Sequence, residues 1–185
     1  MPTKHDFKNI RIALLEGDTD VRQSMKASLN QQTYTQTFAT QALKKFQTAV
    51  FNDEADLIIA DVDDNTEGEQ VATLMKRIRH NEITQNPFPI SIAITGNSDI
   101  QNIQRIINSG FDALLLKPFS MATMIGRVNA LRQHRAPFAV TSQYIGPDRR
   151  QNQRQQSPAD EKHLITVPNP MTLMAEGQMS AANMQ

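Results

Sequence analysis

Three short apolar segments of the sequence each end in a side chain that can take part in chemistry. Asp56-Leu-Ile-Ile-Ala-Asp61 ends in a carboxylate, Ile90-Ser-Ile-Ala-Ile-Thr95 in a hydroxyl, and Leu114-Leu-Leu-Lys117 in an ammonium. If the segments are strands of one open parallel sheet, these side chains meet at its carboxyl edge, where ligand sites form. A nucleophilic oxygen, a hydrogen-bond donor and a cation at one edge predict a phosphoryl-binding site.

Composition excludes several other classes of function. The chain of 185 residues has 19 basic and 19 acidic side chains, so bulk electrostatics give no reason to expect direct nucleic-acid binding. It has no cysteine, which excludes disulfides, thiolate catalysis and cysteine-ligated metals. No apolar run resembles a signal peptide or reaches membrane-spanning length, so we expect a cytoplasmic protein without membrane insertion.

The alternation of apolar segments predicts the elements that would position this site. Strand-like runs occur at residues 10–15, 35–39, 57–60, 90–95 and 113–116, and stretches with helical apolar spacing follow them. Nearly continuous apolar strands are typical of a parallel sheet covered by helices on both faces. We therefore expect a doubly wound α/β domain over residues 9–135, preceded by an N-terminal arm at residues 1–8.

The character of the chain changes after Arg135. Proline and glycine recur, and Gln151–Gln156 is polar and of low complexity. Such a composition buries too little apolar area to offset its chain entropy, which predicts a largely disordered tail over residues 136–185. Two local features stand out in it, the segment Phe138–Arg150 and the methionine-rich end from Met171 to Met184.

Taken together, residues 9–133 resemble the receiver domain of two-component response regulators. The resemblance rests on Asp61, on Thr95 followed by Gly96, and on Lys117 followed by Pro118. It implies a flavodoxin-like (βα)5 fold with strand order 2-1-3-4-5. It also implies signalling without enzymatic turnover, with a histidine kinase or phosphotransfer protein as the partner.

Within that resemblance each of the three side chains has a role. Asp61 is the phosphoacceptor that forms an acyl phosphate, and the hydroxyl of Thr95 contacts a phosphoryl oxygen. The ammonium of Lys117 pairs with Asp61 and then with the phosphoryl group, and the Lys–Pro peptide bond is typically cis. Taken singly, each has a plainer interpretation: an Asp that ends a turn, a Thr that ends a strand, and a surface Lys before a proline.

The first departure from the family concerns magnesium. The family places two acidic residues after the first strand, whereas this chain has Glu16-Gly17-Asp18, with glycine at the position of the main ligand. The expected ligands for Mg²⁺ are therefore Asp61, Glu16 acting through a water, and Asp18 if the loop shifts by one residue. Mg²⁺ is usually bound through one or two carboxylates and waters, so losing one weakens the site.

Two further departures affect the loop after Asp61 and the output. The loop at residues 62–68 lacks the family's proline, and Asp63 and Asp64 either compensate for Gly17 or form a solvated acidic loop. Leu114 occupies the position of the family's switch aromatic residue, which leaves packing as the means of transmitting a change.

Three functions follow as hypotheses. The first is a receiver that accepts a phosphoryl group on Asp61 and signals through protein contact, without a separate output domain. The alternative is a pseudo-receiver, an interaction module that works without phosphorylation because its magnesium site is degenerate at Gly17. A flavin carrier on the same fold ranks last, because the acidic loop after the first strand does not suit a flavin phosphate.

Overall fold

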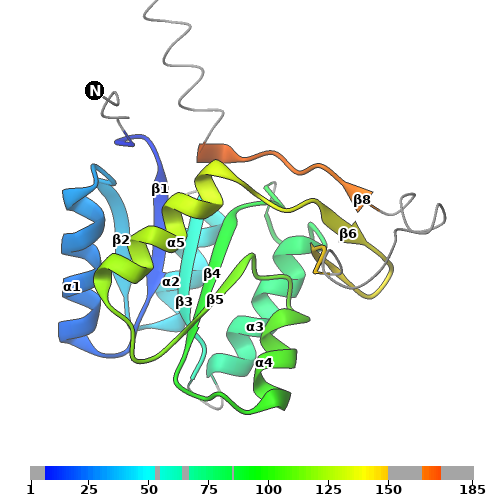
Figure 1. Ribbon diagram of the computed structural model, residues 1–185, viewed down its shortest axis with the longest axis horizontal. Helices are drawn as coiled ribbons and strands as arrows, with labels where there is room; N and C mark the ends of the chain where they lie inside the picture. The colour runs from blue at the N-terminus through cyan, green and yellow to red at the C-terminus, as the bar shows by residue number, and fades with distance from the viewer. Residues whose placement is uncertain (1–6, 53–54, 64–66, 85, 150–163, 172–185) are drawn as a thin grey trace, which may run out of the picture.

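The centre of the fold is a parallel sheet of five strands (Figure 1). The structure is a computed structural model, which describes residues 7–52, 55–63, 67–84, 86–149 and 164–171. The strands are β1 (Arg11–Leu15), β2 (Gln36–Thr40), β3 (Leu57–Asp61), β4 (Ile90–Thr95) and β5 (Ala113–Leu116). Their order is β2-β1-β3-β4-β5, all pairs parallel, which confirms the predicted flavodoxin-like topology.

Helices cover both faces of the sheet, which is why the strands have few polar positions. The helices are α1 (Thr19–Gln31), α2 (Leu43–Asn52), α3 (Glu67–Arg79), α4 (Ile100–Ile107) and α5 (Met121–Gln133). Helices α1 and α5 lie together on one face, where Leu14 and Ile59 meet Met25 and Val128. Helices α2, α3 and α4 cover the other face, and their apolar side chains form a second core cluster with alternate residues of the same strands.

Local signals explain where the helices begin and end. Ser120 caps α5 by accepting a hydrogen bond from the Thr123 amide. Gly110 follows α4 and has a φ of 85°, a left-handed conformation that favours glycine. A Cβ at this position would also lie 2.5 Å from the carbonyl oxygen of Ile145, so only glycine fits there.

Part of the predicted tail of residues 136–185 forms regular structure after α5. Three short strands form an antiparallel sheet, here called the C-terminal sheet, in the order β7-β6-β8. They are β6 (Phe138–Val140), β7 (Ile145–Pro147) and β8 (Leu164–Ile165). Phe138 within it is fully buried. Residues 150–163 and 172–185, which include the polar stretch and most of the methionine-rich end, lie outside the described residues, as does most of the N-terminal arm.

A buried ionic cluster joins the C-terminal sheet to the amino ends of β4 and β5. Asp112 binds Arg79 at 2.9 Å and Arg135 at 2.8 Å, and all three charged side chains are almost fully buried. The two guanidinium carbons lie 5.0 Å and 4.8 Å from the ring centre of Phe138. Buried charges are tolerated when they are paired and hydrogen-bonded, and Arg79 also donates to the carbonyl oxygens of Pro87, Pro89 and Gly110. The ring of Phe138, itself fully buried, thus packs against both guanidinium groups of the cluster.

Residues 164–171 return to the end of α5. The side-chain amide of Asn169 donates to the carbonyl oxygens of Leu131 and Arg132 at 3.0 Å and 2.9 Å, which satisfies carbonyls that the helix leaves unpaired. Met171 is fully buried in the core cluster beneath α1 and α5. Composition alone could not show this packing, because its partners are scattered through the domain. No helix in the described parts of the chain is long and apolar enough to cross a bilayer.

We expect Phe138→Ala to destabilise the whole domain. Truncating a buried Phe typically costs about 3–5 kcal/mol, and here it also removes the ring that both guanidinium groups contact. Urea unfolding of the full chain measures the loss. The matched control is Ile165→Ala in the same sheet, since Ile165 is 39% exposed and should cost little. Equal, small losses for both variants would mean that the C-terminal sheet contributes nothing to stability.

Candidate functional site

The site lies at the carboxyl edge of the sheet, at the opposite end from the C-terminal sheet (Figure 1). Asp61 ends β3 and Thr95 ends β4, while Glu16 directly follows β1 and Lys117 directly follows β5. The parallel register carries these positions to one edge, with Asp61 paired to Ile94 and Thr95 paired to Leu116. The sequence analysis expected these strand ends to meet, because the carboxyl ends of parallel strands lie at one edge of the sheet.

The ammonium of Lys117 is the centre of the site. Its Nζ lies 2.6 Å from Oδ2 of Asp61, 3.5 Å from Oε2 of Glu16 and 3.7 Å from Oδ2 of Asp63. Burial lowers the pKa of Lys117, but the hydrogen bond and charge of Asp61, together with the charges of Glu16 and Asp63, hold that pKa above its ordinary value. The peptide bond to Pro118 is cis, as the family resemblance implies.

Glu16 is a buried carboxylate with one unsatisfied oxygen. Its side chain is only 1% exposed; Oε1 accepts a hydrogen bond from the Asp18 amide at 3.0 Å, and Oε2 has no hydrogen-bond partner. The ion pair of Oε2 with Lys117 is longer than a hydrogen bond. Burial raises the pKa of Glu16 above its ordinary value, and the neighbouring charge of Asp61 adds to this increase.

Asp63 connects the acid and hydroxyl parts of the site. Its backbone amide donates to Oδ1 of Asp61 at 3.0 Å. Its carboxylate accepts the hydroxyl proton of the fully buried Thr95, and it accepts the Gly96 amide at 2.6 Å. The sequence analysis considered Asp63 either as compensation for Gly17 or as part of a solvated acidic loop. It therefore missed the contacts of this carboxylate with Thr95 and Gly96. The available signal was its position two residues beyond Asp61, which returns the side chain towards the same edge.

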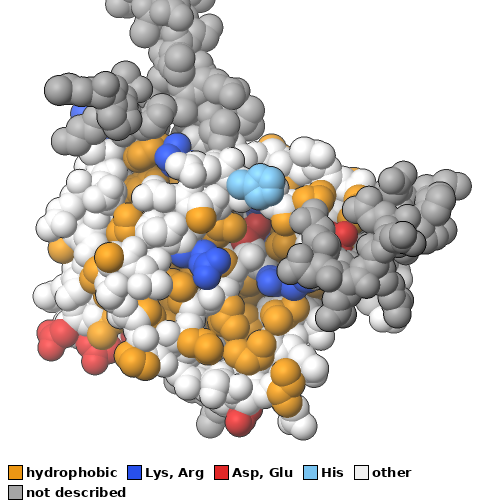
Figure 2. All heavy atoms as spheres, in the orientation of Figure 1, with side chains coloured by type: hydrophobic (Ala, Val, Ile, Leu, Met, Phe, Trp, Pro, Cys, Tyr) orange, Lys and Arg blue, Asp and Glu red, His pale blue; other side chains and the backbone are white. Residues whose placement is uncertain are grey.

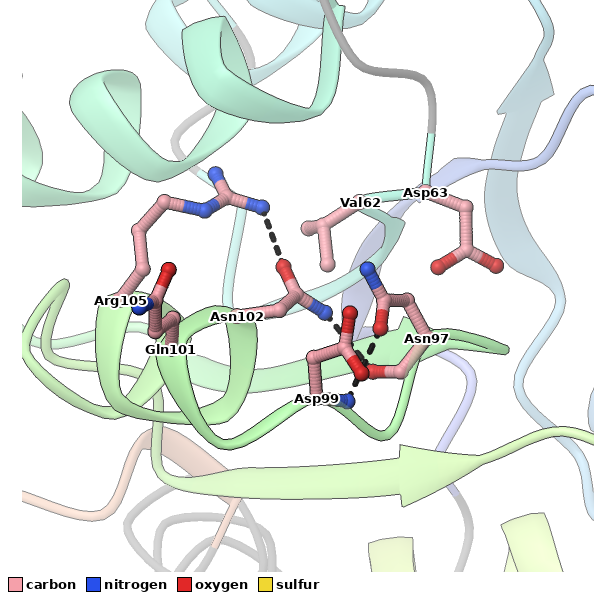
Figure 3. Close-up of a pocket in the computed structure, with 7 residues that line it drawn as sticks. All are labelled: Val62, Asp63, Asn97, Asp99, Gln101, Asn102 and Arg105. Carbon is pink, nitrogen blue, oxygen red and sulfur yellow. Dashed lines mark hydrogen bonds between the residues drawn. The ribbon is translucent and has the colours of Figure 1, made fainter.

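Asn102 joins Thr95 to helix α4 and was also missed. Its Nδ2 lies 3.2 Å from Oγ1 of Thr95 and 2.8 Å from the carbonyl oxygen of Asn97, and Arg105 donates to its Oδ1 at 2.8 Å. Figure 3 shows Asn97, Asn102 and Arg105 along a pocket of about 340 Å³ that Asp63 also lines. No sequence signal marks Asn102, because a polar residue on a surface helix is ordinary.

Asp18 does not join this group of carboxylates. Its Oδ1 accepts hydrogen bonds from the amides of Asp20 and Val21, so it is the N-cap of α1. These hydrogen bonds lower the pKa of Asp18. Among the described residues, no ion pair or hydrogen bond links its carboxylate to Lys117. The structure therefore gives no support to Asp18 as a replacement for the missing acid.

Glu16 and Asp61 provide few ligands for Mg²⁺. Within the described ranges, no group of three or more acidic or imidazole side chains could hold a metal ion. Mg²⁺ can nevertheless be bound through one or two carboxylates, with waters and phosphate oxygens as the other ligands. The unsatisfied buried Oε2 of Glu16, beside Asp61, fits that pattern. Gly17 has no side chain that could bind a metal ion. A Cβ there would meet no atom within 4 Å, so there is space for a larger side chain at this position.

We expect the stability of the metal-free protein to depend on pH through Glu16. Because its folded-state pKa is raised, the folded protein holds this proton more tightly than the unfolded chain. The unfolding free energy therefore falls as pH rises from the ordinary value of 4.5 through the raised pKa. In Glu16→Gln this fall should be smaller, as measured by urea unfolding in EDTA across that range. A variant curve parallel to the wild-type curve would contradict the assignment.

Comparisons with known proteins agree with this fold. The sequence matches the family described as response regulator receiver domain over residues 12–129, which is more than half of its 185 residues. No curated protein sequence matches the chain.

Solved structures with a similar fold include three response regulators or chemotaxis proteins. A response regulator from Thermotoga maritima is 19% identical with a TM-score of 0.57, over 67% of this chain and 98% of that one. A two-component response regulator from Clostridium difficile is 23% identical with a TM-score of 0.57, over 67% and 96%. The chemotaxis protein CheY4 of Vibrio cholerae is 18% identical with a TM-score of 0.56, over 65% and 96%. At these sequence identities, the similarity is evidence for the fold alone. Because the family match covers both the sheet and the four strand ends that carry the site, the chain belongs to the response regulator receiver domain family.

Proposed function

We propose that this chain is a phospho-accepting receiver, in which Asp61 takes a phosphoryl group from a histidine kinase or a phosphotransfer protein. Receiver domains are signalling modules of two-component systems. The observation that carries the proposal is the ion pair of 2.6 Å between Asp61 and Lys117 at the carboxyl edge of the sheet. The side chain of Asp61 is 17% exposed there, so a donor group can reach it.

The transfer would use the side chains in defined roles. A carboxylate oxygen of Asp61 attacks the phosphorus of a phosphohistidine, the O–P bond forms, and the P–N bond breaks. The electron pair of that bond leaves with the imidazole nitrogen, which takes up a proton. The ammonium of Lys117 would stabilise the negative charge that spreads over the phosphoryl oxygens. Glu16 and Asp61 would hold Mg²⁺, whose charge neutralises the same oxygens.

The charge balance shows why a second cation matters. Two unit charges about 4 Å apart interact by roughly 4 kcal/mol at an effective dielectric constant of about 20. Phosphorylation would replace the single charge of the Asp61 carboxylate with about two negative charges on the phosphoryl group, close to the carboxylates of Glu16 and Asp63, which share the ammonium of Lys117. The phosphorylated state therefore needs a metal ion or a displacement of Asp63.

Two other observations, at Gly17 and at Asp63, favour the pseudo-receiver as a second candidate. Gly17 supplies no metal ligand, and the Asp63 carboxylate already occupies the donors of Thr95 and Gly96. A domain of this kind would signal with its site permanently filled by its own acid.

The proposed output is contact with another protein through the face formed by α4, β5 and α5. Apolar side chains gather over α4 and β5 in Figure 2, in the view of Figure 1. Ile100 is 68% exposed and Leu116 is 47% exposed. Leu114, also on β5, is half-buried, and it puts a leucine rather than an aromatic side chain at that position.

We expect the full chain to gain the mass of one phosphoryl group when it is incubated with Mg²⁺ and acetyl phosphate. Asp61→Asn should remove this gain, because the amide is not a nucleophile towards phosphorus. Intact-mass spectrometry measures the result. The control Asp99→Asn changes an exposed acid near the same edge and should leave the gain intact. A wild-type chain that stays unmodified at millimolar Mg²⁺ would favour the pseudo-receiver.

We expect Gly17→Asp to strengthen Mg²⁺ binding by roughly tenfold, because it adds a carboxylate next to Glu16 in open space. Isothermal titration calorimetry compares the variant with the wild-type chain. Gly126→Asp is the matched control, since Gly126 also has open space around it but lies on α5. Equal affinity in both variants would show that the position after Glu16 does not face the metal.

A further inference from the structure

The carboxylate of Asp63 is bound as a ligand would be. Its two oxygens accept from different donors, the Thr95 hydroxyl on Oδ1 and the Gly96 amide on Oδ2, the latter at 2.6 Å. The Lys117 ammonium lies 3.7 Å from Oδ2. An acid that merely faces solvent would not collect a buried hydroxyl, a backbone amide and a cation. Thr95, Gly96 and Lys117 together form a set of donors suited to an anion, here called the anion cradle.

A phosphoryl group on Asp61 would need the same cradle. The Asp63 amide donates to Oδ1 of Asp61 at 3.0 Å, and Lys117 contacts both carboxylates, so the two acids lie side by side. A hydroxyl has one proton and a backbone amide has one proton, so each can satisfy one acceptor well. Asp63 and a phosphoryl oxygen are therefore mutually exclusive partners of Thr95 and Gly96.

We propose that Asp63 is a built-in ligand of the anion cradle, which stands in for the phosphoryl group before phosphorylation and must leave when that group arrives. The inference rests on the proposed function in one respect, the identity of the competing anion. Its consequence is that Thr95 is already held by an anion in the unmodified protein. Phosphorylation then exchanges one anion for another at Thr95, and Asp63 is the side chain that moves.

The surroundings of Asp63 provide a place for the displaced carboxylate. The side chain is 29% exposed and lines the pocket of about 340 Å³. Figure 3 shows Asp63 and Arg105 on opposite sides of that pocket, with Asn102 between them. A carboxylate that turns out of the cradle thus enters a polar space with a guanidinium on its far wall.

The first test measures occupancy of the cradle without any phosphodonor. The ¹H–¹⁵N resonance of the Gly96 amide reports its hydrogen bond to Asp63. We expect Asp63→Ala to move it upfield, and sodium acetate, which supplies the missing carboxylate, to move it back. Asp99→Ala removes an exposed acid beside the same pocket and should leave the resonance in place. Asp63→Asn keeps the side-chain volume and should give a smaller shift in the same direction.

The second test measures competition. With acetyl phosphate and Mg²⁺, the full chain carrying Asp63→Ala should gain a phosphoryl group about tenfold faster than wild type, as expected when a charged hydrogen-bond acceptor no longer has to be displaced. Asp99→Ala should match the wild-type rate within about twofold. Intact mass at timed points gives these rates.

The two readouts separate this inference from the proposed function. If the Gly96 resonance moves only in the Asp63 variants and no protein gains mass, Asp63 does fill the cradle and the phosphoacceptor function is wrong. If wild type and Asp63→Ala gain mass at equal rates, the inference is overturned and the proposed function stands. A Gly96 resonance that stays in place in Asp63→Ala also overturns the inference, and the mass measurement alone then decides the proposed function. Similar effects of Asp99→Ala and Asp63→Ala would also overturn it, because they would reflect charge alone.

Discussion

The site depends on one ammonium shared among three carboxylates. Lys117 contacts Asp61, Glu16 and Asp63, and it is the only cation with ion pairs to these acids among the described residues. Without it, carboxylates at such short separations would repel one another, and the buried Glu16 would have no counter-charge. The parallel sheet places the ends of four strands so close together that one ammonium contacts three carboxylates.

A second set of buried charges holds the opposite end of the molecule. There Asp112 is shared between Arg79 and Arg135, and the Phe138 ring contacts both guanidinium groups. Burial lowers the pKa of Arg79 to about 10, with Asp112 opposing that effect, so the guanidinium remains charged at neutral pH. The two ends follow the same rule, since each buried charge is kept by a partner of opposite sign. They differ in exposure, because the Lys117 site is open to reacting groups and the Asp112 cluster is closed.

Much of the fold could be predicted because the strands are short, apolar and regularly spaced. The positions of Asp61, Thr95 and Lys117 followed from a general property of parallel sheets, so their convergence needed no knowledge of loop shape. The roles of Asp18 and Asp63 did depend on loop shape: one acid turned to cap a helix and the other turned to Thr95. The C-terminal sheet escaped prediction because its anchors, Arg79 and Asp112, are far away in the sequence and look like ordinary charged residues.

The hydrogen bond between Asn102 and Thr95 has a consequence for how a signal would leave the site. Thr95 gives its proton to Asp63 and receives the side-chain amide of Asn102, so the hydroxyl lies between the anion and the first turns of α4. Leu114 offers no ring that could swing through the core. A relay of hydrogen bonds from Asp63 through Thr95 to Asn102 needs no void to open in the apolar core and no core side chain to change rotamer. The tightly packed interior could thus stay unaltered while a change at Thr95 reaches the first turn of α4.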